Sequence, residues 1–153
     1  METTLQDGDR LIVQKISKNL SKIRGQEYIP RRGEIVVFDK PEYLNNTSGN
    51  VDHLIKRVIG LPGERIVARD GKYTIYNKEF PDGFNPDDDQ EYAKDIVTTP
   101  GEVDITVGEK EIFVSGDNRT NSLDSRVFGA INTNSITGTV TVRFVPLNSF
   151  ERF

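Results

Sequence analysis

Short apolar runs separated by glycine, proline and polar turns dominate the pattern along the chain. Within these runs apolar and polar side chains tend to alternate, and Val, Ile, Phe, Tyr and Thr are frequent, which is typical of β-strands. The runs predicted to form strands are 10–14, 34–38, 54–59, 64–68, 73–76, 103–107, 111–115 and 138–145. The pattern therefore predicts a mainly β fold with many short strands and little helix.

One turn can be assigned from the residues themselves. Asp70 and Gly71 lie between the runs ERIVAR and KYTIYN, and both residue types tolerate the positive φ of a tight primed turn. We therefore predict a β-hairpin at this point. The apolar spacing within residues 14–24 is compatible with a short amphipathic helix, and a basic loop fits it equally well.

The segment 70–108 differs from its surroundings because it carries this hairpin turn and an acidic stretch, NPDDDQEYAKD at 85–95. That stretch has no core-like apolar pattern, so a solvated loop fits it better than a helical turn beginning at Asn85. We predict an inserted variable subdomain over 70–108 and a β core formed by residues 1–69 and 109–153.

Composition narrows the possible chemistry. The 153 residues are 35% hydrophobic and 29% charged, as expected for one compact domain. Lys+Arg 20 against Asp+Glu 24 gives a net charge of -4, which argues against a broad nucleic-acid-binding face. Cysteine is absent and His53 is the single histidine, so a thiolate or His-based metal site, a thiolate nucleophile and a histidine relay are not expected. Catalysis would have to use Ser, Thr, Lys, Asp or Glu.

Hydropathy gives no sign of a membrane span or a cleavable signal. No apolar run approaches the roughly 18 to 20 residues that a span needs, and METTLQDGDR lacks the basic and apolar regions of a signal peptide. From hydropathy alone we expect the chain to be soluble.

The run HLIKRVIG at 53–60 places a lysine among aliphatic side chains. Alternation puts Lys56 on one face with Leu54 and Val58, and it puts His53 on the opposite face, where a surface position is expected. Burial lowers the pKa of a lysine, so a neutral Lys56 could accept a proton from a serine hydroxyl, as in a Ser/Lys dyad. A lysine that reaches from an edge strand to solvent is the alternative, and this run alone favours it.

The segment SGDNRTNSLDSRVFG at 115–129 packs charged and hydroxyl side chains behind the apolar run EIFV. Ser122 offers a hydroxyl that could orient a neighbouring group. The charged side chains allow two ion pairs: Asp124 with Arg126, and Asp117 with either Arg57 or Arg119. A polar turn held by its own Asn and Asp side chains is the alternative, and this segment alone favours it.

Together, HLIKRVIGLPGE and GDNRTNSLDSRVFG resemble the lysine box and the Gly-Asp-Asn-Arg box of the type I signal peptidases, or leader peptidases, which are membrane-bound Ser/Lys serine proteases. METTLQDGDRLIV and RRGEIVVF resemble two further segments of that family, so the resemblance runs from end to end. It implies a mainly β fold, with an antiparallel β-barrel or β-sheet catalytic core and an inserted smaller β lobe.

The resemblance also implies roles for individual residues. Lys56 would be the general base, and Ser122 would orient its amine. Supporting roles would fall to Gly116, which allows close packing beside the lysine, and to the ion pairs Asp117–Arg57 and Asp124–Arg126. The substrate groove is expected near Met1, Leu54 and Ile55.

In the family the nucleophile is the serine just before the methionine that aligns with Met1. The nucleophile and the preceding membrane span are therefore expected to be missing from this sequence, and Thr3 stands where the family usually has proline. A start placed one residue too late is a simpler explanation than an inactive paralogue, because the lysine box and Ser122 are intact. We predict little or no hydrolysis by the 153-residue chain itself.

The function implied is that of signal peptidase I, a serine endopeptidase that removes signal peptides through an acyl-enzyme on the extracytoplasmic side of the bacterial cytoplasmic membrane. The implied partners are extended signal peptides, with small residues at the first and third positions before the cut, and the lipid bilayer surface; nucleic acid, metal and cofactor are not implied. One alternative is a catalytically inactive β-barrel module that binds extended peptides or a protein partner. Another is a relative of LexA-like self-cleaving repressor domains, against which the Gly-Asp-Asn-Arg box argues.

Overall fold

The computed structural model describes residues 1, 4–5, 10–14, 28–39, 53–145 and 151–152. Each strand predicted from the sequence is present, with ends that differ by at most two residues. The proposed helix over 14–24 lies outside the described residues beyond Gln14, which ends the first strand. The elements in chain order are β1 (Arg10–Gln14), β2 (Ile35–Asp39), β3 (His53–Gly60), β4 (Arg65–Arg69), β5 (Lys72–Tyr76), η2 (Glu91–Ala93), β6 (Val103–Thr106), β7 (Glu111–Ser115), η3 (Arg119–Asn121), α2 (Ser125–Phe128), β8 (Ile131–Asn132), η4 (Thr133–Ser135), β9 (Ile136–Val145) and β10 (Glu151–Arg152).

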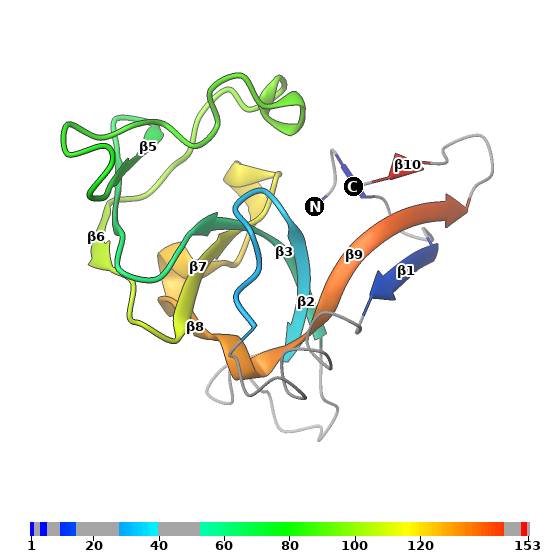
Figure 1. Ribbon diagram of the computed structural model, residues 1–153. Coiled ribbons are helices and arrows are strands. Elements are labelled where there is room, and N and C mark those ends of the chain that lie inside the picture. Colours follow the sequence, from blue (N-terminus) through cyan, green and yellow to red (C-terminus); the bar gives the residue numbers. More distant parts are fainter. Residues whose placement is uncertain (2–3, 6–9, 15–27, 40–52, 146–150, 153) are drawn as a thin grey trace, which may run out of the picture.

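Most strands belong to one curved antiparallel sheet (Figure 1). Its order is β1-β9-β2-β3-β7-β8, and β10 pairs with β9 off this path. Of the expected alternatives, barrel or sheet, the structure shows the sheet: no pairing among the described strands joins β1 to β8. At one end of the path, β8 has only two residues before η4 begins.

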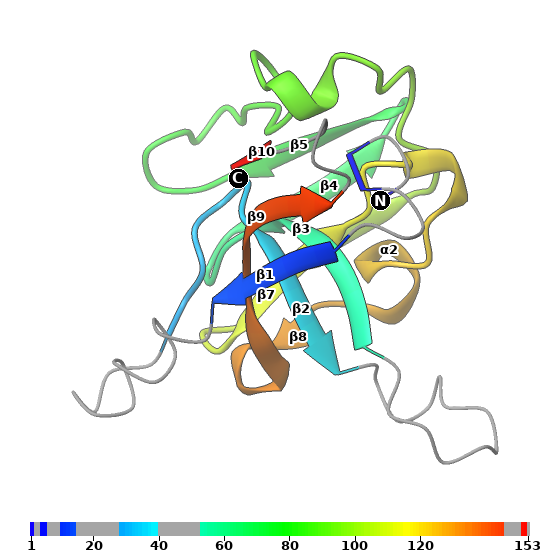
Figure 2. The same ribbon diagram turned by 90° about the vertical axis from the view of Figure 1, so that its right-hand side faces the viewer.

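A second, smaller sheet has the order β5-β4-β6 and forms a lobe above the larger one (Figures 1 and 2). Asp70 and Gly71 have φ of 52° and 78°, which confirms the predicted hairpin between β4 and β5. Strand β4 also pairs with β6, so this sheet already begins at Arg65. The predicted boundary between residues 69 and 70 thus falls in the hairpin turn, and the division into core and insertion stays a prediction.

The lobe packs directly on the larger sheet. Ile59 of β3 and Phe113 of β7 share a buried apolar cluster with Ile66 and Tyr73 of the small sheet. A Cβ added to Gly60 would lie 2.5 Å from Cδ1 of Ile66 and 3.0 Å from Cβ of Phe113, so glycine is required where the two sheets approach. The contact places Tyr73 of the lobe beside the end of β7.

Strand β3 is anchored by three apolar clusters. Val58 belongs to the main cluster of the large sheet, Ile59 to the cluster shared with the lobe, and Ile55 packs against the cluster formed around β2 and β9. Burial of an aliphatic side chain is worth about 1.5 to 3 kcal/mol, so these contacts fix the register of the strand. Lys56 and Arg57 are therefore held on opposite faces of β3.

Helix is scarce in the described ranges, as predicted. α2 has four residues, and the remaining helical elements are 3-10 turns. The acidic stretch 85–95 forms turns, with η2 as its helical part, and not a helical turn beginning at Asn85. None of the helices that the structure describes is long and apolar enough to cross a membrane.

Candidate active site

Lys56 lies on β3 opposite Val36 of β2, on the face that also carries Leu54 and Val58. The aliphatic surroundings predicted from alternation are thus present, and the lysine is half-buried. This burial lowers the pKa of the Lys56 amine below its ordinary value, and it outweighs the opposing attraction of Asp124 and Asp117. The amine is therefore neutral over a wider pH range than a surface lysine, as a general base requires.

Gly116 and Ser122 lie next to Lys56. Gly116 directly follows β7, and Ser122 directly follows η3. A Cβ on Gly116 would lie 2.2 Å from Oγ of Ser122 and 3.8 Å from Cδ of Lys56, so the missing side chain makes room for both. The buried Oγ of Ser122 has no hydrogen-bond partner among the described residues. The tertiary structure thus brings a lysine with a lowered pKa and an unpaired hydroxyl against the same glycine.

Of the two partners considered for Asp117, the structure selects Arg57. Nε and Nη2 of Arg57 donate to the two carboxylate oxygens at 2.8 Å and 2.7 Å, and Nη1 donates to the carbonyl of Gly33 at 2.7 Å. Both side chains are almost fully buried. The hydroxyl of Thr4 donates a further hydrogen bond to Asp117. The pair joins the lysine strand, the Gly-Asp-Asn-Arg turn and the N-terminal segment.

The second expected ion pair is also present. Nε and Nη2 of Arg126 donate to Asp124 at 2.8 Å and 2.7 Å. Asp124 also accepts hydrogen bonds from the backbone N–H of Gly116 at 3.0 Å and from the hydroxyl of Ser115 at 2.9 Å. Burial alone would raise the pKa of the Asp124 carboxyl, but these bonds outweigh it and lower the pKa. Asp124 is therefore a fixed negative charge that holds Gly116.

Tyr73 extends this network into the small lobe. Its hydroxyl donates to Oγ of Ser115 at 3.0 Å, and Ser115 in turn donates to Asp124. Burial, aided by the charge of Asp124, raises the pKa of Tyr73 to about 12, so the phenol stays protonated and remains a donor. The sequence did not predict this link, because the pattern around Tyr73 indicates only a strand of the hairpin.

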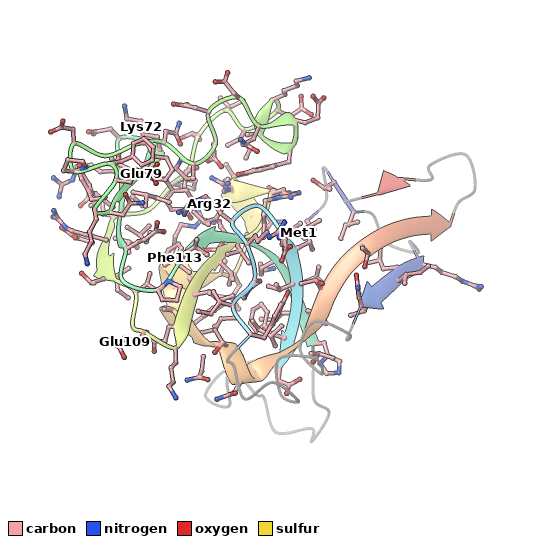
Figure 3. All side chains as sticks on the ribbon, in the orientation of Figure 1. Met1, Arg32, Lys72, Glu79, Glu109 and Phe113 are labelled. Atoms are coloured by element: carbon pink, nitrogen blue, oxygen red, sulfur yellow. The ribbon has the colours of Figure 1, made fainter. Side chains whose placement is uncertain are left out.

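The start of the chain lies beside the two boxes. The N–H groups of Thr4 and Leu5 both donate to the carbonyl of Met1, which forms a tight turn. In Figures 1 and 2 the N-terminus lies beside the yellow segment that contains Gly116 and η3, which agrees with the bond from Thr4 to Asp117. Figure 3 shows Met1 close to the start of β2.

The structure brings together only part of the predicted groove. Met1 and Ile55 pack against one apolar cluster, whereas Leu54 faces the other side of β3 and packs against another. His53 has an exposed side chain and pairs with Asp39 at 3.0 Å, away from the face of Lys56, as predicted. Within the described ranges, no group of three or more His, Asp or Glu side chains is arranged to hold a metal.

The acidic stretch differs from the expected solvated loop at Asp87 and at Tyr92. The carboxylate of Asp87 is 11% exposed and binds the guanidinium of Arg119 through both oxygens. The ring of Tyr92, from the same stretch, packs on the guanidinium of Arg57, and its centre lies 3.9 Å from Cζ. The run of three aspartates signalled a surface loop, and nothing in it distinguished the carboxylate that pairs across 32 residues. Asp88 and Asp89 are exposed, as predicted.

The fold and these residues resemble those of known proteins. The family model "Signal peptidase, peptidase S26" matches residues 1–145. Among curated relatives, signal peptidase I of Leptolyngbya laminosa is 35% identical over 150 residues, which cover 97% of this chain and 66% of the relative. Probable signal peptidase I-2 of Synechocystis is 35% identical, with coverage of 96% and 60%. The chain thus spans a little less than two thirds of each of these relatives.

A relative from another group and a solved structure agree with this result. Signal peptidase I of Bacillus licheniformis is 32% identical over 154 residues, which cover 99% of this chain and 75% of the relative. The crystal structure of a signal peptidase I from Enterococcus faecalis V583 matches with a TM-score of 0.56 and 28% identity, covering 74% of this chain and 98% of that one. The family model over residues 1–145 and the curated relatives, which align with nearly all of this chain, show that the chain belongs to the signal peptidase family, peptidase S26.

Proposed function

We propose that this chain is the catalytic part of a signal peptidase I, a serine endopeptidase that removes signal peptides from exported preproteins. The observation that carries the proposal is the half-buried Lys56, with its lowered pKa, against Gly116 and the unpaired hydroxyl of Ser122. Lys56 is the general base, and Ser122 orients its amine by a hydrogen bond. The buried ion pair Arg57–Asp117 joins the two boxes. The buried pair Arg126–Asp124 lies within the second box and holds Gly116 through Asp124.

The proposed reaction begins with a serine hydroxyl at the position just before Met1. The neutral Lys56 amine takes the hydroxyl proton as the serine oxygen attacks the scissile carbonyl, and the ammonium then protonates the leaving amine. Water next attacks the acyl-enzyme ester, Lys56 removes its proton, and the ammonium returns that proton to the serine oxygen as the ester bond breaks. The turn at Met1 and the bond from Thr4 to Asp117 support this assignment, because they keep the N-terminal end beside the lysine box.

The proposed substrate is an extended signal peptide with small residues at the first and third positions before the cut. It would add as a strand beside β3, near Met1 and Ile55. The proposed setting is the extracytoplasmic side of the bacterial cytoplasmic membrane, with the working enzyme anchored in the bilayer. In this setting the inserted segment 70–108 is a lobe on a catalytic core made by residues 1–69 and 109–153.

A cleavage assay tests the proposal. The chain is extended by a serine directly before Met1 and by a preceding apolar span of about 20 residues, and preprotein cleavage is followed by gel shift. We expect cleavage by this form and its loss in Lys56→Ala, whereas Lys72→Ala, which changes an exposed lysine, leaves cleavage intact. Cleavage that persists in Lys56→Ala would refute the assigned base, and an extended form without cleavage would refute the proposed activity. The 153-residue chain serves as the blank, because it does not include the serine position.

A further inference from the structure

We propose that Asp87 and Tyr92, both from the acidic stretch 85–95, are positioning residues for Lys56. They act through two buried arginines, Arg119 and Arg57, which hold the turn against which Lys56 packs. The inference deepens the proposed function, because the catalytic value of a positioned Lys56 rests on its role as the base. The positioning itself is a property of the folded chain and can be measured without any cleavage.

Tyr92 covers one flat face of the Arg57 guanidinium. The centre of its ring lies 3.9 Å from Cζ, and the edges of the guanidinium are bound by Asp117 and the carbonyl of Gly33. A cation over an aromatic face is attracted by the ring quadrupole, more strongly where water is excluded. Arg57 is only 5% exposed, so removing the ring would open its guanidinium to solvent. Tyr92 therefore restrains the arginine that holds Asp117.

Asp87 restrains Arg119 as Tyr92 restrains Arg57. Nη2 of Arg119 donates to Oδ1 of Asp87 at 2.7 Å, and Nη1 donates to Oδ2. Nε of Arg119 donates to the carbonyl of Gly116 at 3.1 Å, and Nη1 also reaches the hydroxyl of Thr99 at 2.9 Å. Asp87 supplies the carboxylate that neutralises this buried cation. Without it, Arg119 would be drawn toward water and away from Gly116.

The two contacts are joined within the loop. The hydroxyl of Tyr92 donates to Oδ1 of Asp87 at 3.0 Å and to the carbonyl of Pro86 at 3.2 Å. The chain of contacts thus runs from Asp117 through Arg57, Tyr92 and Asp87 to Arg119. It begins and ends on the same short turn, residues 116–119. We call this chain of contacts the clamp.

Gly116 links the clamped turn to Lys56, because it packs against both Lys56 and Ser122. There is no spare room at this residue, since a Cβ would overlap Ser122 and touch Cδ of Lys56. A shift of the turn by a few tenths of an ångström would therefore change both the burial of Lys56 and its approach to the Ser122 hydroxyl. The charged groups that act on Lys56, Asp124, Asp117 and Arg126, are all retained when the loop residues are changed.

The test measures the titration of Lys56 in the 153-residue chain by NMR of ¹³C-labelled lysine side chains, with the signal assigned through Lys56→Ala. The variants are Asp87→Asn and Tyr92→Leu. Asp89→Asn is the matched control, because it removes the same charge from an exposed side chain two residues along, at a φ of 59° that asparagine tolerates. Tyr92→Phe keeps the ring over Arg57. Circular dichroism and the amide spectrum confirm that each variant is folded.

We expect the pKa of Lys56 to rise by about 0.5 or more in Asp87→Asn and Tyr92→Leu, because a looser turn admits water to the amine. Asp89→Asn should keep the original value, and Tyr92→Phe, which keeps the ring over Arg57 but loses the bond to Asp87, should shift it less than Tyr92→Leu does. A simple loss of negative charge would lower the lysine pKa, so the expected direction separates positioning from charge. An unchanged titration in both loop variants, or an equal shift in Asp89→Asn, would overturn the proposal. If Asp87→Asn does not fold, Tyr92→Leu alone tests the proposal, because it removes no charge.

This result is independent of the cleavage assay. A raised Lys56 pKa in a chain whose serine-extended form does not cleave would support the clamp and refute the protease assignment. An unchanged pKa in a chain whose extended form cleaves would refute the clamp alone.

Discussion

Gly116 faces Ser122 so closely that a Cβ on the glycine would lie 2.2 Å from Oγ and 2.8 Å from Cβ of the serine. Lys56 lies against the same glycine, with Cδ 3.8 Å from such a Cβ, so a side chain at this position must displace the serine while it contacts the lysine. The closeness of these residues therefore bears on both stability and the proposed chemistry.

We predict that Gly116→Ala lowers the free energy of unfolding by about 1 to 3 kcal/mol, as overpacking of a tight site does. The double variant Gly116→Ala/Ser122→Gly should recover most of this loss, because it removes both serine atoms that meet the new methyl group. Urea unfolding of the two single variants and the double variant gives the coupling. Additive losses would show that the two positions do not compete for space.

Breaking the Arg57–Asp117 pair should be costly. Asp117→Asn leaves the buried guanidinium without its carboxylate, and we expect a loss of about 3 to 5 kcal/mol in the free energy of unfolding. The pair Arg65–Asp104, also bound through two hydrogen bonds but about half exposed, is the control. Asp104→Asn should change stability little, because solvent screens an exposed pair. Similar losses in both variants would contradict the importance we give to burial.

Asp124 should contribute to unfolding by acid. Its pKa is lower in the folded state than in the unfolded chain, so its contribution is fully present above the unfolded pKa of about 3.9 and is lost as the pH falls through the folded pKa. We expect Asp124→Asn to be less stable than the parent at pH 7, with a difference that shrinks progressively below about pH 4. Urea unfolding at pH 7, 4 and 3 measures this. A difference that stayed constant with pH would exclude the carboxylate charge as its source.

Lys56 should lower stability at neutral pH. Because burial lowers its pKa in the folded state, the unfolded chain binds the proton more tightly, and stability rises with pH from the folded pKa to the unfolded value near 10.5. We predict that Lys56→Met is more stable than the parent at pH 7 and that the difference narrows as the pH approaches 10.5. Lys72→Met, which changes an exposed lysine, is the control. A parent chain more stable than Lys56→Met at pH 7 would show that the amine is not penalised by burial.

Much of the local structure was determined by the sequence. Alternation of apolar residues located the strands to within two residues, and Asp70-Gly71 specified a turn with both φ values positive. Both follow from short-range effects: the period of two along a strand and the steric limits on φ. The same alternation put Lys56 and His53 on opposite faces of β3. The lysine box and the Gly-Asp-Asn-Arg box, read as residues in order, also indicated the family that the comparisons then showed.

Other features were decided only by the tertiary structure. Asp117 could have met Arg57 or Arg119, and the choice depended on which element packs against which. The partner of Arg119 proved to be Asp87, from a loop that looked solvated, and Tyr73 and Tyr92 reached the site from the small lobe. The sequence does not indicate which distant residue a carboxylate or a phenol will bind, because long-range pairing depends on how sheets and loops pack. The sequence supplied the lysine, and the fold determined its depth of burial and the groups that hold it in place.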